Sequence, residues 1–481
     1  GHVQTPYMKM FSIRRRTKMS KAISRRNFLM ATGAVGAAGL LAACGSKPAA
    51  SSTASSAASQ APAASADESL ALSDGPVNLS ISWWGGDSRH AAYQSALEAF
   101  QAEHSNITVE PTFAAWSGWE EKMAAAFIAG NAQDVCQVNW NWLYNYSADG
   151  SKFVDLNTTS KFIDLTQWDS AAMDACYVAN SQQCVPVSMT GRIFYWNMTT
   201  FNKAGITEVP KSLDDLMAAG KAFQEKLGDD YYPMHLGAYD RMILMVFYLE
   251  SKYGKDWADP VTSTLNYTEE EIAEGLAFIK SLVDNHVMMN LKTYYSANSD
   301  TATHQSNEWI TGKIAGIFEW DSAASKYSSA LDDSNKDGFT VGEEIKFGDN
   351  NGGFSKVSMG LAITKTCKNV AEAATLINFL LNEEKGASIM GSECGIPASK
   401  AGLKFAQDAG AVKSLVAEAN AKVMAFTTNK LDPLFENNDL KASGTGIYQE
   451  VFDNIDYGDQ TPEEAVETLL DGMESVGYTI G

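Results

Sequence analysis

The stretch Val77–Phe100, "VNLSISWWGGDSRHAAYQSALEAF", contains two different hydrophobic periods in succession. Apolar and polar residues alternate over Val77–Trp83, which is typical of a half-buried β-strand. Over Tyr93–Phe100 the apolar residues recur at the spacing of one helix face. A glycine pair and a polar cluster separate the two segments, so the stretch predicts a strand, a turn and a helix in that order.

The same order of elements is repeated directly afterwards. A strand-like run begins at Ile107, a helical pattern ends at Gly130, and a short apolar run begins at Asp134. Further strand-like runs cover residues 185–196, 313–320 and 357–363, and helical patterns begin at Ser212, Thr268 and Asn369. Strands that alternate with helices at this spacing favour an α/β fold, in which helices flank a parallel sheet. Ligands bind at the carboxyl ends of the strands in such sheets.

The first 43 residues have the composition of a secretory signal peptide. They carry eight Lys or Arg and no acidic residue, and they lead into an uncharged segment, Phe28–Ala43, that stops at Cys44. The sequence "LAAC" at Leu41–Cys44 resembles the lipobox of bacterial lipoproteins, in which the cysteine receives a diacylglycerol group and becomes the new N-terminus. The segment Ser24–Met30, "SRRNFLM", resembles a twin-arginine export motif, and both the twin-arginine and the general export route stay open. We therefore expect a protein anchored by lipid at Cys44 to the extracytoplasmic face of the cell membrane.

The charge balance beyond this signal excludes several classes of partner. From Cys44 onward the chain has 29 basic and 58 acidic side chains, hence a net charge of −29. Such an excess of negative charge repels nucleic acid and anionic lipid. Residues 44–76 are predicted to be a linker, since fifteen of the eighteen residues 49–66 are Ala or Ser. We expect a monomer beyond this linker, with no nucleic-acid partner.

Five cysteines follow Cys44, and their spacing does not indicate a zinc site. Cys176 and Cys184 flank a segment that could form a hairpin. A disulfide between them and two reduced thiols are both compatible with the sequence.

Six of the eleven tryptophans lie between Trp83 and Trp142. Sugars have apolar C–H faces and rims of hydroxyl groups, so their binding sites combine flat aromatic rings with planar polar side chains. Alternation along the first strand places Trp83 in the core and Trp84 toward a ligand. Of Trp116 and Trp119, we expect Trp119 to pack within the protein and Trp116 to face the ligand. The cluster therefore predicts a carbohydrate platform, although buried packing is the more common role of a tryptophan.

Polar residues accompany these rings. Asp87 and Arg89 directly follow the first predicted strand, where they could hold sugar hydroxyls. The segment "NWNWLYNY" from Asn139 follows the third strand, and in an extended backbone Trp140 and Trp142 face the same side. These residues are therefore expected to surround the ligand.

Several short motifs, in their order along the chain, resemble a known family. They are "GNAQDV" from Gly130, "GRIFYWN" ending at Asn197, "FNKAGITEVPKSLDDL" from Phe201, "GKIAGIFEWD" from Gly312, "NGGFSKVSMGLAI" from Asn351, "EAATLINFLLNEEKG" from Glu372 and "CGIPAS" from Cys394. Together they resemble family 1 of the extracellular solute-binding proteins, the sugar-capturing lipoproteins of bacterial ABC importers. The resemblance covers residues 77–481. Within the family, "SWWGGDSRH" followed by "QVNWNWL" is most similar to binders of oligosaccharides, including pectic oligogalacturonides.

The resemblance implies an α/β protein with the two-lobed periplasmic-binding-protein (Venus flytrap) fold, each lobe a mostly parallel sheet flanked by helices. The implied N-lobe comprises residues 77–188 with 359–400, and the implied C-lobe comprises residues 192–355 with 401–481. Such a protein is not an enzyme and has no cofactor; it captures an oligosaccharide between its lobes and delivers it to ABC permease subunits. The residues expected to contact the ligand are Trp84, Asp87, Arg89, Trp116, Asn139, Trp140, Trp142, Arg192, Tyr239, Trp320, Asp321, Gly353 and Phe354.

An acidic sugar is a more specific hypothesis for the ligand. A chain with a net charge of −29 does not attract anions at long range, so it would have to hold a carboxylate through local guanidinium groups. Arg89 and Arg192 are the two candidates. The alternatives are a surface pair of Arg89 with Asp87 or Glu120, and a salt bridge between lobes for Arg192.

One motif points to a different ligand. The segment "DSNKDGFTVGEE" matches the spacing of a calcium loop through Asp333, Asn335, Asp337 and Glu344. No clear amphipathic helix precedes it, so the motif lacks its usual context.

The sequence contains no GxSxG, HExxH, P-loop or dinucleotide fingerprint. A secreted glycoside hydrolase stays open as an alternative, because 58 acidic residues could supply a catalytic carboxylate pair. A receptor for a non-sugar solute on the same scaffold is the other alternative.

The lipobox makes a direct prediction about Cys44. Metabolic labelling with an alkynyl fatty acid should tag the wild-type chain, because the thiol of Cys44 is the group that receives the lipid. The Cys44→Ala variant should lose the label, and an equal signal from both chains would refute the assignment.

Overall fold

The computed structural model describes residues 66–116 and 118–481. The predicted signal peptide 1–43, the lipidation site Cys44 and the linker as far as residue 65 lie outside the described residues. None of the helices that the structure describes is long and apolar enough to span a membrane.

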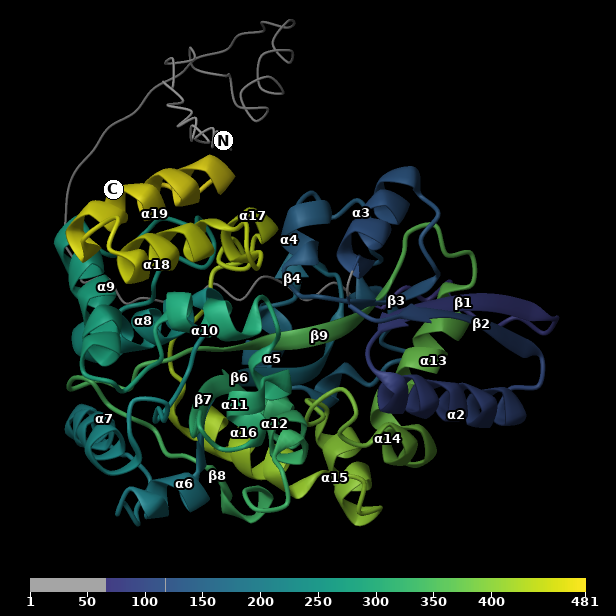
Figure 1. The fold of residues 1–481 in the computed structure, drawn as a ribbon. Coiled ribbons are helices and arrows are strands. Elements are labelled where there is room, and N and C mark those ends of the chain that lie inside the picture. Colours follow the sequence, from purple (N-terminus) through teal and green to yellow (C-terminus); the bar gives the residue numbers. More distant parts are fainter. Residues whose placement is uncertain (1–65, 117) are drawn as a thin grey trace, which may run out of the picture. The chain divides into compact units, whose positions relative to one another are not determined.

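A seven-stranded sheet runs through the described chain in the order β2-β1-β3-β9-β6-β7, and β8 also pairs with β6 (Figure 1). The strands are β1 (Val77–Trp84), β2 (Ile107–Ala114), β3 (Val135–Val138), β6 (Val185–Asn197), β7 (Gly316–Trp320), β8 (Phe339–Val341) and β9 (Ser355–Ile363). The strand predicted from the alternation at Val77 is thus present. Its buried positions include Val77, Leu79 and Ile81, as the period of two requires.

Parallel pairing extends less far along this sheet than the sequence predicts. β1 pairs in parallel with β2 and β3, whereas β9 is antiparallel to β3 and β6, and β6 is antiparallel to β7 and β8. The reason is the path of the chain: β6 carries it from the β1 end of the sheet to the β7 end, and β9 carries it back. Two strands that lie side by side and carry the chain in opposite directions must be antiparallel.

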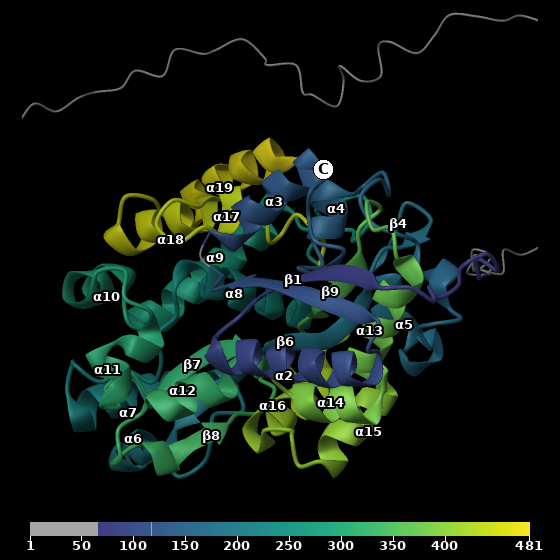
Figure 2. The same ribbon diagram turned by 90° about the vertical axis from the view of Figure 1, so that its right-hand side faces the viewer.

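Helices cover both faces of the β1 end. Figure 2 shows α3 and α4 on one side of β1, and α2 and α14 on the other. The helices of this end are α2 (Asp87–Glu103), α3 (Trp119–Ala129), α4 (Trp142–Tyr146), α13 (Val370–Asn382), α14 (Glu384–Met390) and α15 (Lys400–Asp408). The predicted helix face is correct, since Tyr93, Leu97 and Phe100 of α2 are buried. Gly130 ends α3 in the left-handed conformation, with a φ of 69°.

A second group of helices surrounds the β7 end (Figure 1). They are α6 (Met198–Lys203), α7 (Leu213–Leu227), α8 (Ala238–Tyr253), α9 (Glu269–Asp284), α10 (Leu291–Asn298), α11 (Asn307–Ile310), α12 (Ala324–Ala330), α16 (Ser414–Phe426), α17 (Asn438–Lys441), α18 (Ile447–Tyr457) and α19 (Pro462–Val476). The capping box predicted at Thr268 is present: its side chain accepts from the N–H of Glu271, and the Glu271 carboxylate accepts from the N–H of Thr268. The apolar stripe beyond it is buried, as the helical period requires.

The short helix α5 (Ser170–Asp174) precedes a hairpin of β4 (Tyr177–Val178) and β5 (Ser181–Gln182). Ala179 and Asn180 turn this hairpin with positive φ angles of 55° each. The hairpin that the sequence suggested is therefore real. Cys176 and Cys184, on either side of it, are both buried and both carry free thiols.

A buried ion pair joins two helices of the β7 end. Arg241 of α8 lies 2.8 Å from the carboxylate of Asp456 in α18, and neither side chain is appreciably exposed. Arg241 also donates to the carbonyls of Leu236 and Met289, and Asp456 accepts from the N–H of Leu291. These bonds connect α8, α18 and the start of α10 through one buried ion pair.

Replacement of Arg241 by Met should lower the free energy of unfolding by about 3 to 5 kcal/mol, because it leaves the buried carboxylate of Asp456 without its counter-charge. Urea denaturation followed by circular dichroism measures this change. A control variant, Lys280→Met, removes an exposed pair with Asp284 and should cost no more than about 0.5 kcal/mol. Equal effects of the two substitutions would contradict the structural role of Arg241.

Candidate functional site

The loops that follow β1 and β7 face each other across a cavity of about 350 Å³. We call it the serine cavity, because α2, the segment after β7 and α12 together contribute four serine side chains to its lining. Its lining residues are Gly86, Ser88, Arg89, Ser322, Ser325, Lys326, Ser329, Ser392, Glu393, Gly395, Lys413 and Val416. The cavity lies beyond the carboxyl end of β1, which is where the sequence predicted a ligand.

A second cavity, of about 420 Å³, adjoins the first and shares Ser322 and Lys326 with it. We call it the aromatic cavity, since the rings of Tyr239 and Trp320 line it. Its remaining lining residues are Arg192, Asp240, Glu319 and Ala323. Both volumes lie within the range of small-molecule sites in proteins.

The serine cavity carries an excess of positive charge. Arg89 donates from Nη1 to the carbonyl of Trp84 (3.0 Å) and from Nε to the carbonyl of Glu393 (3.1 Å). Lys413 pairs with the carboxylate of Glu393 at 3.3 Å, and that carboxylate also accepts from the Ser88 hydroxyl at 2.7 Å. Among the described residues, no carboxylate lies within ion-pair distance of Arg89 or Lys326. Three cations thus face this cavity against one carboxylate.

The aromatic cavity has balanced charges instead, with Arg192 and Lys326 against Asp240 and Glu319. Arg192 is 1% exposed, and its Nη1 lies 2.7 Å from Asp240 and 3.0 Å from Glu319. The guanidinium carbon lies 4.2 Å from the centre of the Trp320 ring, so the ring stacks on the cation. Burial raises the pKa of Asp240 to about 6, although Arg192 acts in the opposite direction. The structure therefore holds Arg192 in ion pairs with two residues of the same implied C-lobe, 192–355, and these pairs are not the salt bridge between lobes that the sequence left open.

A buried carboxylate, Glu436, fixes the side chains around the aromatic cavity. Both of its oxygens lie 2.8 Å from the ammonium group of Lys356 in β9. The Tyr239 hydroxyl donates to it at 2.8 Å, and the Trp140 ring N–H donates at 3.2 Å. Lys356 in turn lies 4.8 Å from the centre of the Trp320 ring. Glu436 thereby orients two rings that come from distant parts of the chain.

The predicted tryptophans form a cluster beside the cavities rather than their lining. Trp83 is in the core, as predicted, where it stacks on Tyr93 and Phe113. Trp84 contacts the rings of Trp116 and Trp142 at centroid distances of 5.1 and 5.5 Å. None of Trp84, Trp116, Trp140 and Trp142 lines either cavity. Trp116 alone of these four is substantially exposed, at 39%.

The expectation that Trp140 and Trp142 face the same side is wrong. It assumed an extended backbone, whereas the chain turns into helix α4 at Trp142. Trp140 therefore points to Glu436, and the fully buried Trp142 points into the cluster with Trp84. Asn139, which precedes them, is also buried.

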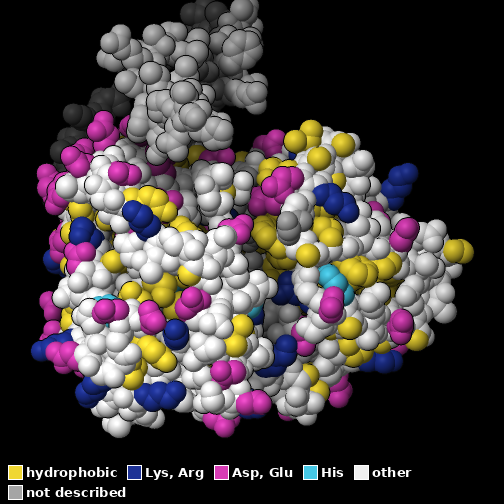
Figure 3. Space-filling model, in the orientation of Figure 1, with side chains coloured by type: hydrophobic (Ala, Val, Ile, Leu, Met, Phe, Trp, Pro, Cys, Tyr) yellow, Lys and Arg dark blue, Asp and Glu magenta, His cyan; other side chains and the backbone are white. Residues whose placement is uncertain are grey.

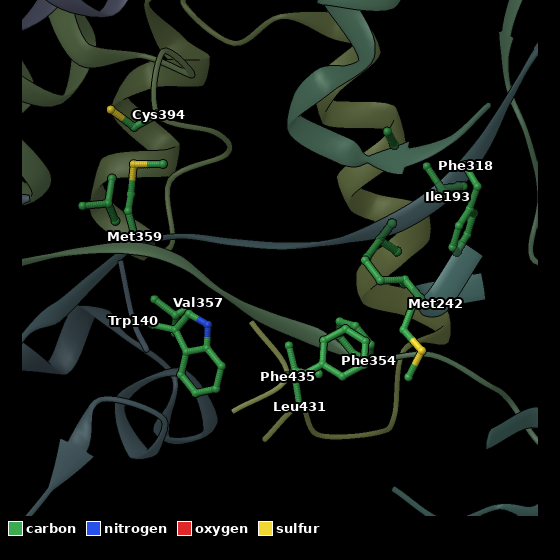
Figure 4. Close-up of a cluster of buried hydrophobic side chains, with 14 of the residues drawn as sticks. Trp140, Ile193, Met242, Phe318, Phe354, Val357, Met359, Cys394, Leu431 and Phe435 are labelled. Atoms are coloured by element: carbon green, nitrogen blue, oxygen red, sulfur yellow. The ribbon is translucent and has the colours of Figure 1, made fainter. Parts of the chain in front are cut away.

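Three other expected contact residues are held within the protein. Asp321 is buried and accepts hydrogen bonds from the Thr190 hydroxyl, the Asn420 amide and the N–H of Ser322. Phe354 lies in the core close to Phe435 and Leu431 (Figure 4). Gly353 has a φ of +118° and donates its N–H to the buried Glu250. None of the three lines a cavity, and the same holds for Asp87, which is exposed in the first turn of α2.

The calcium loop is not formed by the segment that suggested it. Residues Lys336–Gly338 form a 3-10 helical turn that leads directly into β8. The side-chain oxygen of Asn335 accepts from the Asn197 amide, and Asp333 pairs with Lys336. Across residues 66–116 and 118–481, no three His, Cys, Asp or Glu side chains gather in a geometry that could hold a metal ion.

Sequence reasoning missed most of the polar lining. The run "DSAASKYSSA" from Asp321 contains its serines and Lys326, and their density directly after a strand was a usable signal. A lysine within the apolar strand β9 was a signal for Lys356. Glu393, Lys413 and Glu436 had none, because nothing near them in the chain shows that they return to this site.

The sequence profile of bacterial extracellular solute-binding proteins matches residues 86–387. The chain is also similar to proteins named as binding proteins in Brucella abortus and Brucella suis, with 21% identity over 209 residues. That match covers 42% of this chain, and the chain spans about half the length of these relatives, 49%.

Similar solved structures cover most of the chain. A periplasmic oligogalacturonide-binding protein from Yersinia enterocolitica, in complex with saturated digalacturonic acid, is 34% identical with a TM-score of 0.75, over 83% of this chain and 98% of that one. A periplasmic solute-binding protein from Pectobacterium atrosepticum is 32% identical with a TM-score of 0.78, over the same shares. The GacH receptor of Streptomyces glaucescens, at 18% identity, a TM-score of 0.68 and coverage of 84% and 100%, shares the fold.

The turn that presents Glu436 generates a prediction about pH. Asp432 accepts from the N–H groups of Leu434 and Phe435, and burial raises its pKa from 3.8 to about 7. The folded protein therefore retains a proton there that the unfolded chain releases, so this stabilisation is complete below about pH 4 and is lost as the pH rises to 7. Asp432→Asn cannot release that proton. Its stability relative to wild type should improve by about 3 kcal/mol between pH 4.5 and 7.5.

Urea denaturation at several pH values in this window measures the difference. The exposed Asp284→Asn variant is the control and should keep a constant offset from wild type. A constant offset for Asp432→Asn as well would show that its carboxyl group does not titrate in this range.

Proposed function

This chain belongs to the family of bacterial extracellular solute-binding proteins, and from that premise we propose that it is an oligosaccharide receptor of an ABC importer. The family consists of non-catalytic binding proteins that serve ABC-type uptake, so the glycoside hydrolase alternative is dropped. The observation that carries the proposal is the aromatic cavity, which adjoins a cavity rich in hydroxyl groups and cations.

The chemistry of the two cavities suits a carbohydrate. The rings of Trp320 and Tyr239 offer flat apolar surfaces for the C–H faces of a sugar. Serine hydroxyls both donate and accept hydrogen bonds, and the carboxylates of Asp240 and Glu319 accept from sugar hydroxyls. The two connected cavities provide room for more than one sugar unit.

The charges favour an acidic sugar. Arg89 and Lys326 face the serine cavity without a carboxylate partner among the described residues, so a ligand carboxylate would supply the missing counter-charge. Arg192 does not fit this role, since Asp240 and Glu319 already neutralise it. Arg89 is therefore the arginine that we assign to the ligand. The digalacturonic acid in the Yersinia enterocolitica protein supports an acidic ligand, and the exposed cations argue against a polyamine.

We further propose the two lobes implied by the sequence: residues 77–188 with 359–400, and residues 192–355 with 401–481. Side chains from both groups line the serine cavity, among them Arg89 and Lys326. A ligand that contacts both lobes would favour their closed arrangement through its higher affinity for that state. Delivery to a permease and anchoring through Cys44 complete the proposal.

The proposal predicts a change in stability on binding. Acidic oligosaccharides at millimolar concentration should raise the melting temperature of the full chain and change its tryptophan fluorescence, because a ligand that binds only the folded state stabilises it. In calorimetry, Arg89→Gln should weaken binding of an acidic oligomer by about 2 to 3 kcal/mol and that of a neutral oligomer much less.

The matched control is Lys221→Gln, which removes a cation from the exposed face of α7 and should change neither affinity. If no member of a broad panel of neutral and acidic oligosaccharides shifts the melting temperature, the carbohydrate assignment is wrong. Equal losses for acidic and neutral oligomers in Arg89→Gln would refute the role of the arginine.

A further inference from the structure

The two cavities differ in charge, and this difference has a consequence for the composition of the ligand. The serine cavity carries Arg89, Lys326 and Lys413 against the single carboxylate of Glu393. The aromatic cavity carries Arg192 together with Asp240 and Glu319, and it shares Lys326 with the serine cavity. The serine cavity thus holds three cations against one carboxylate, whereas the aromatic cavity holds two cations, Lys326 included, against two carboxylates.

A carboxylate in the aromatic cavity would find no available cation other than Lys326, which this cavity shares with the serine cavity. The guanidinium of Arg192 is 1% exposed, and its Nη1 is bound to Asp240, Glu319 and the carbonyl of Phe318. The second cation nearby, Lys356, is also buried and held by both oxygens of Glu436. Lys441 approaches Tyr239 at 5.8 Å from the ring centre but does not line the cavity. A ligand carboxylate placed here would instead meet two like charges, which is unfavourable.

The same groups suit a neutral sugar. Carboxylates accept hydrogen bonds from hydroxyl groups, and those of Asp240 and Glu319 are held in place by Arg192. The Trp320 ring can support the apolar face of the sugar beside them. The aromatic cavity is therefore built for a unit rich in hydroxyls that carries no charge.

We infer that the ligand is a mixed oligosaccharide, in which a neutral sugar occupies the aromatic cavity and a uronic acid occupies the adjoining serine cavity. This inference rests on the proposed function and makes it more specific. Lys326 lies at the border of the two cavities, where it can reach the acidic unit from the neutral side. A uniform oligogalacturonide would bind less well, since its second carboxylate would face Asp240 and Glu319.

The test is calorimetric titration of the full chain with matched α-1,4-linked disaccharides: galactobiose, digalacturonate, and the two monoacids that carry the carboxyl group on one unit or the other. We expect one monoacid to bind at least about tenfold more tightly than the other monoacid and than digalacturonate, because only its carboxylate lies in the serine cavity. It should also bind at least about tenfold more tightly than galactobiose, which cannot pair with Arg89.

Two variants test which cavity causes each difference in affinity. Asp240→Asn removes one negative charge from the aromatic cavity and should narrow the gap between the better monoacid and digalacturonate. Arg89→Gln should lower the affinity of that monoacid to the level of galactobiose. Lys221→Gln, outside both cavities, should leave every ratio unchanged. The wild-type ratios decide the question even if a variant fails to fold.

The outcomes separate this inference from the proposed function. Digalacturonate that binds as tightly as the better monoacid, or equal affinities of the two monoacids, overturns the mixed composition and leaves an acidic oligosaccharide receptor. Galactobiose that binds as tightly as either monoacid overturns it as well. If none of these compounds binds, and neither do their glucose counterparts, the proposed function fails together with the inference.

Discussion

The antiparallel pair of β6 and β9 is the constraint on which the arrangement of the site depends. β6 pairs with β9 over its first part and with β7 over its second part, so one strand connects both ends of the sheet. Its register places Arg192 opposite Trp320 and Thr190 opposite Lys356. The Trp320 ring consequently lies close to two buried cations. A slip of one residue would turn every one of these side chains to the other face of the sheet.

Each buried cation around the aromatic cavity is paired with at least one carboxylate. Arg192 has two carboxylates, and Lys356 has Glu436. Such pairs add little net stability, because removing both ions from water costs about as much as their attraction returns. Their clear effect here is geometric, since Glu436 also binds Tyr239 and Trp140. The charges thus hold the rings in fixed positions while leaving the cavity itself without net charge.

The serine cavity is different, because its cations outnumber its carboxylates although the chain as a whole carries a large net negative charge. Figure 3 shows acidic side chains spread widely over one face of the molecule, and Lys and Arg side chains that border a hollow near its centre. Cations that face a cavity from several elements create a local positive potential even when the whole molecule repels anions. At long range the molecule therefore repels anions, and the positive potential of the cavity acts only at short distance.

The tryptophan cluster shows the limit of predicting side-chain direction from a sequence pattern. Its size suggested a ligand platform, yet Trp84, Trp116 and Trp142 pack on one another, and Trp140 binds Glu436. By residue type alone, a large aromatic ring suits a buried packing position as well as it suits a sugar-binding position. The directions of the Trp140 and Trp142 rings depend on helix α4, which the alternation in "NWNW" does not reveal.

The sequence by itself determined the features that depend on neighbours along the chain. Alternation predicted β1 with Trp83 in the core, the helical period predicted the buried face of α2, and Thr268 with Glu271 predicted the start of α9. These follow from the backbone period and from local hydrogen bonds. The tertiary structure alone decided which cations remain available to a ligand, since Asp240 and Glu319 lie far from Arg192 in the chain, and Glu436 lies far from Lys356. Ion pairing depends on distance in space: the pairing of β6 with β7 and β9 positions Arg192, Glu319 and Lys356, while Asp240 reaches them from α8 and Glu436 from the segment before α17.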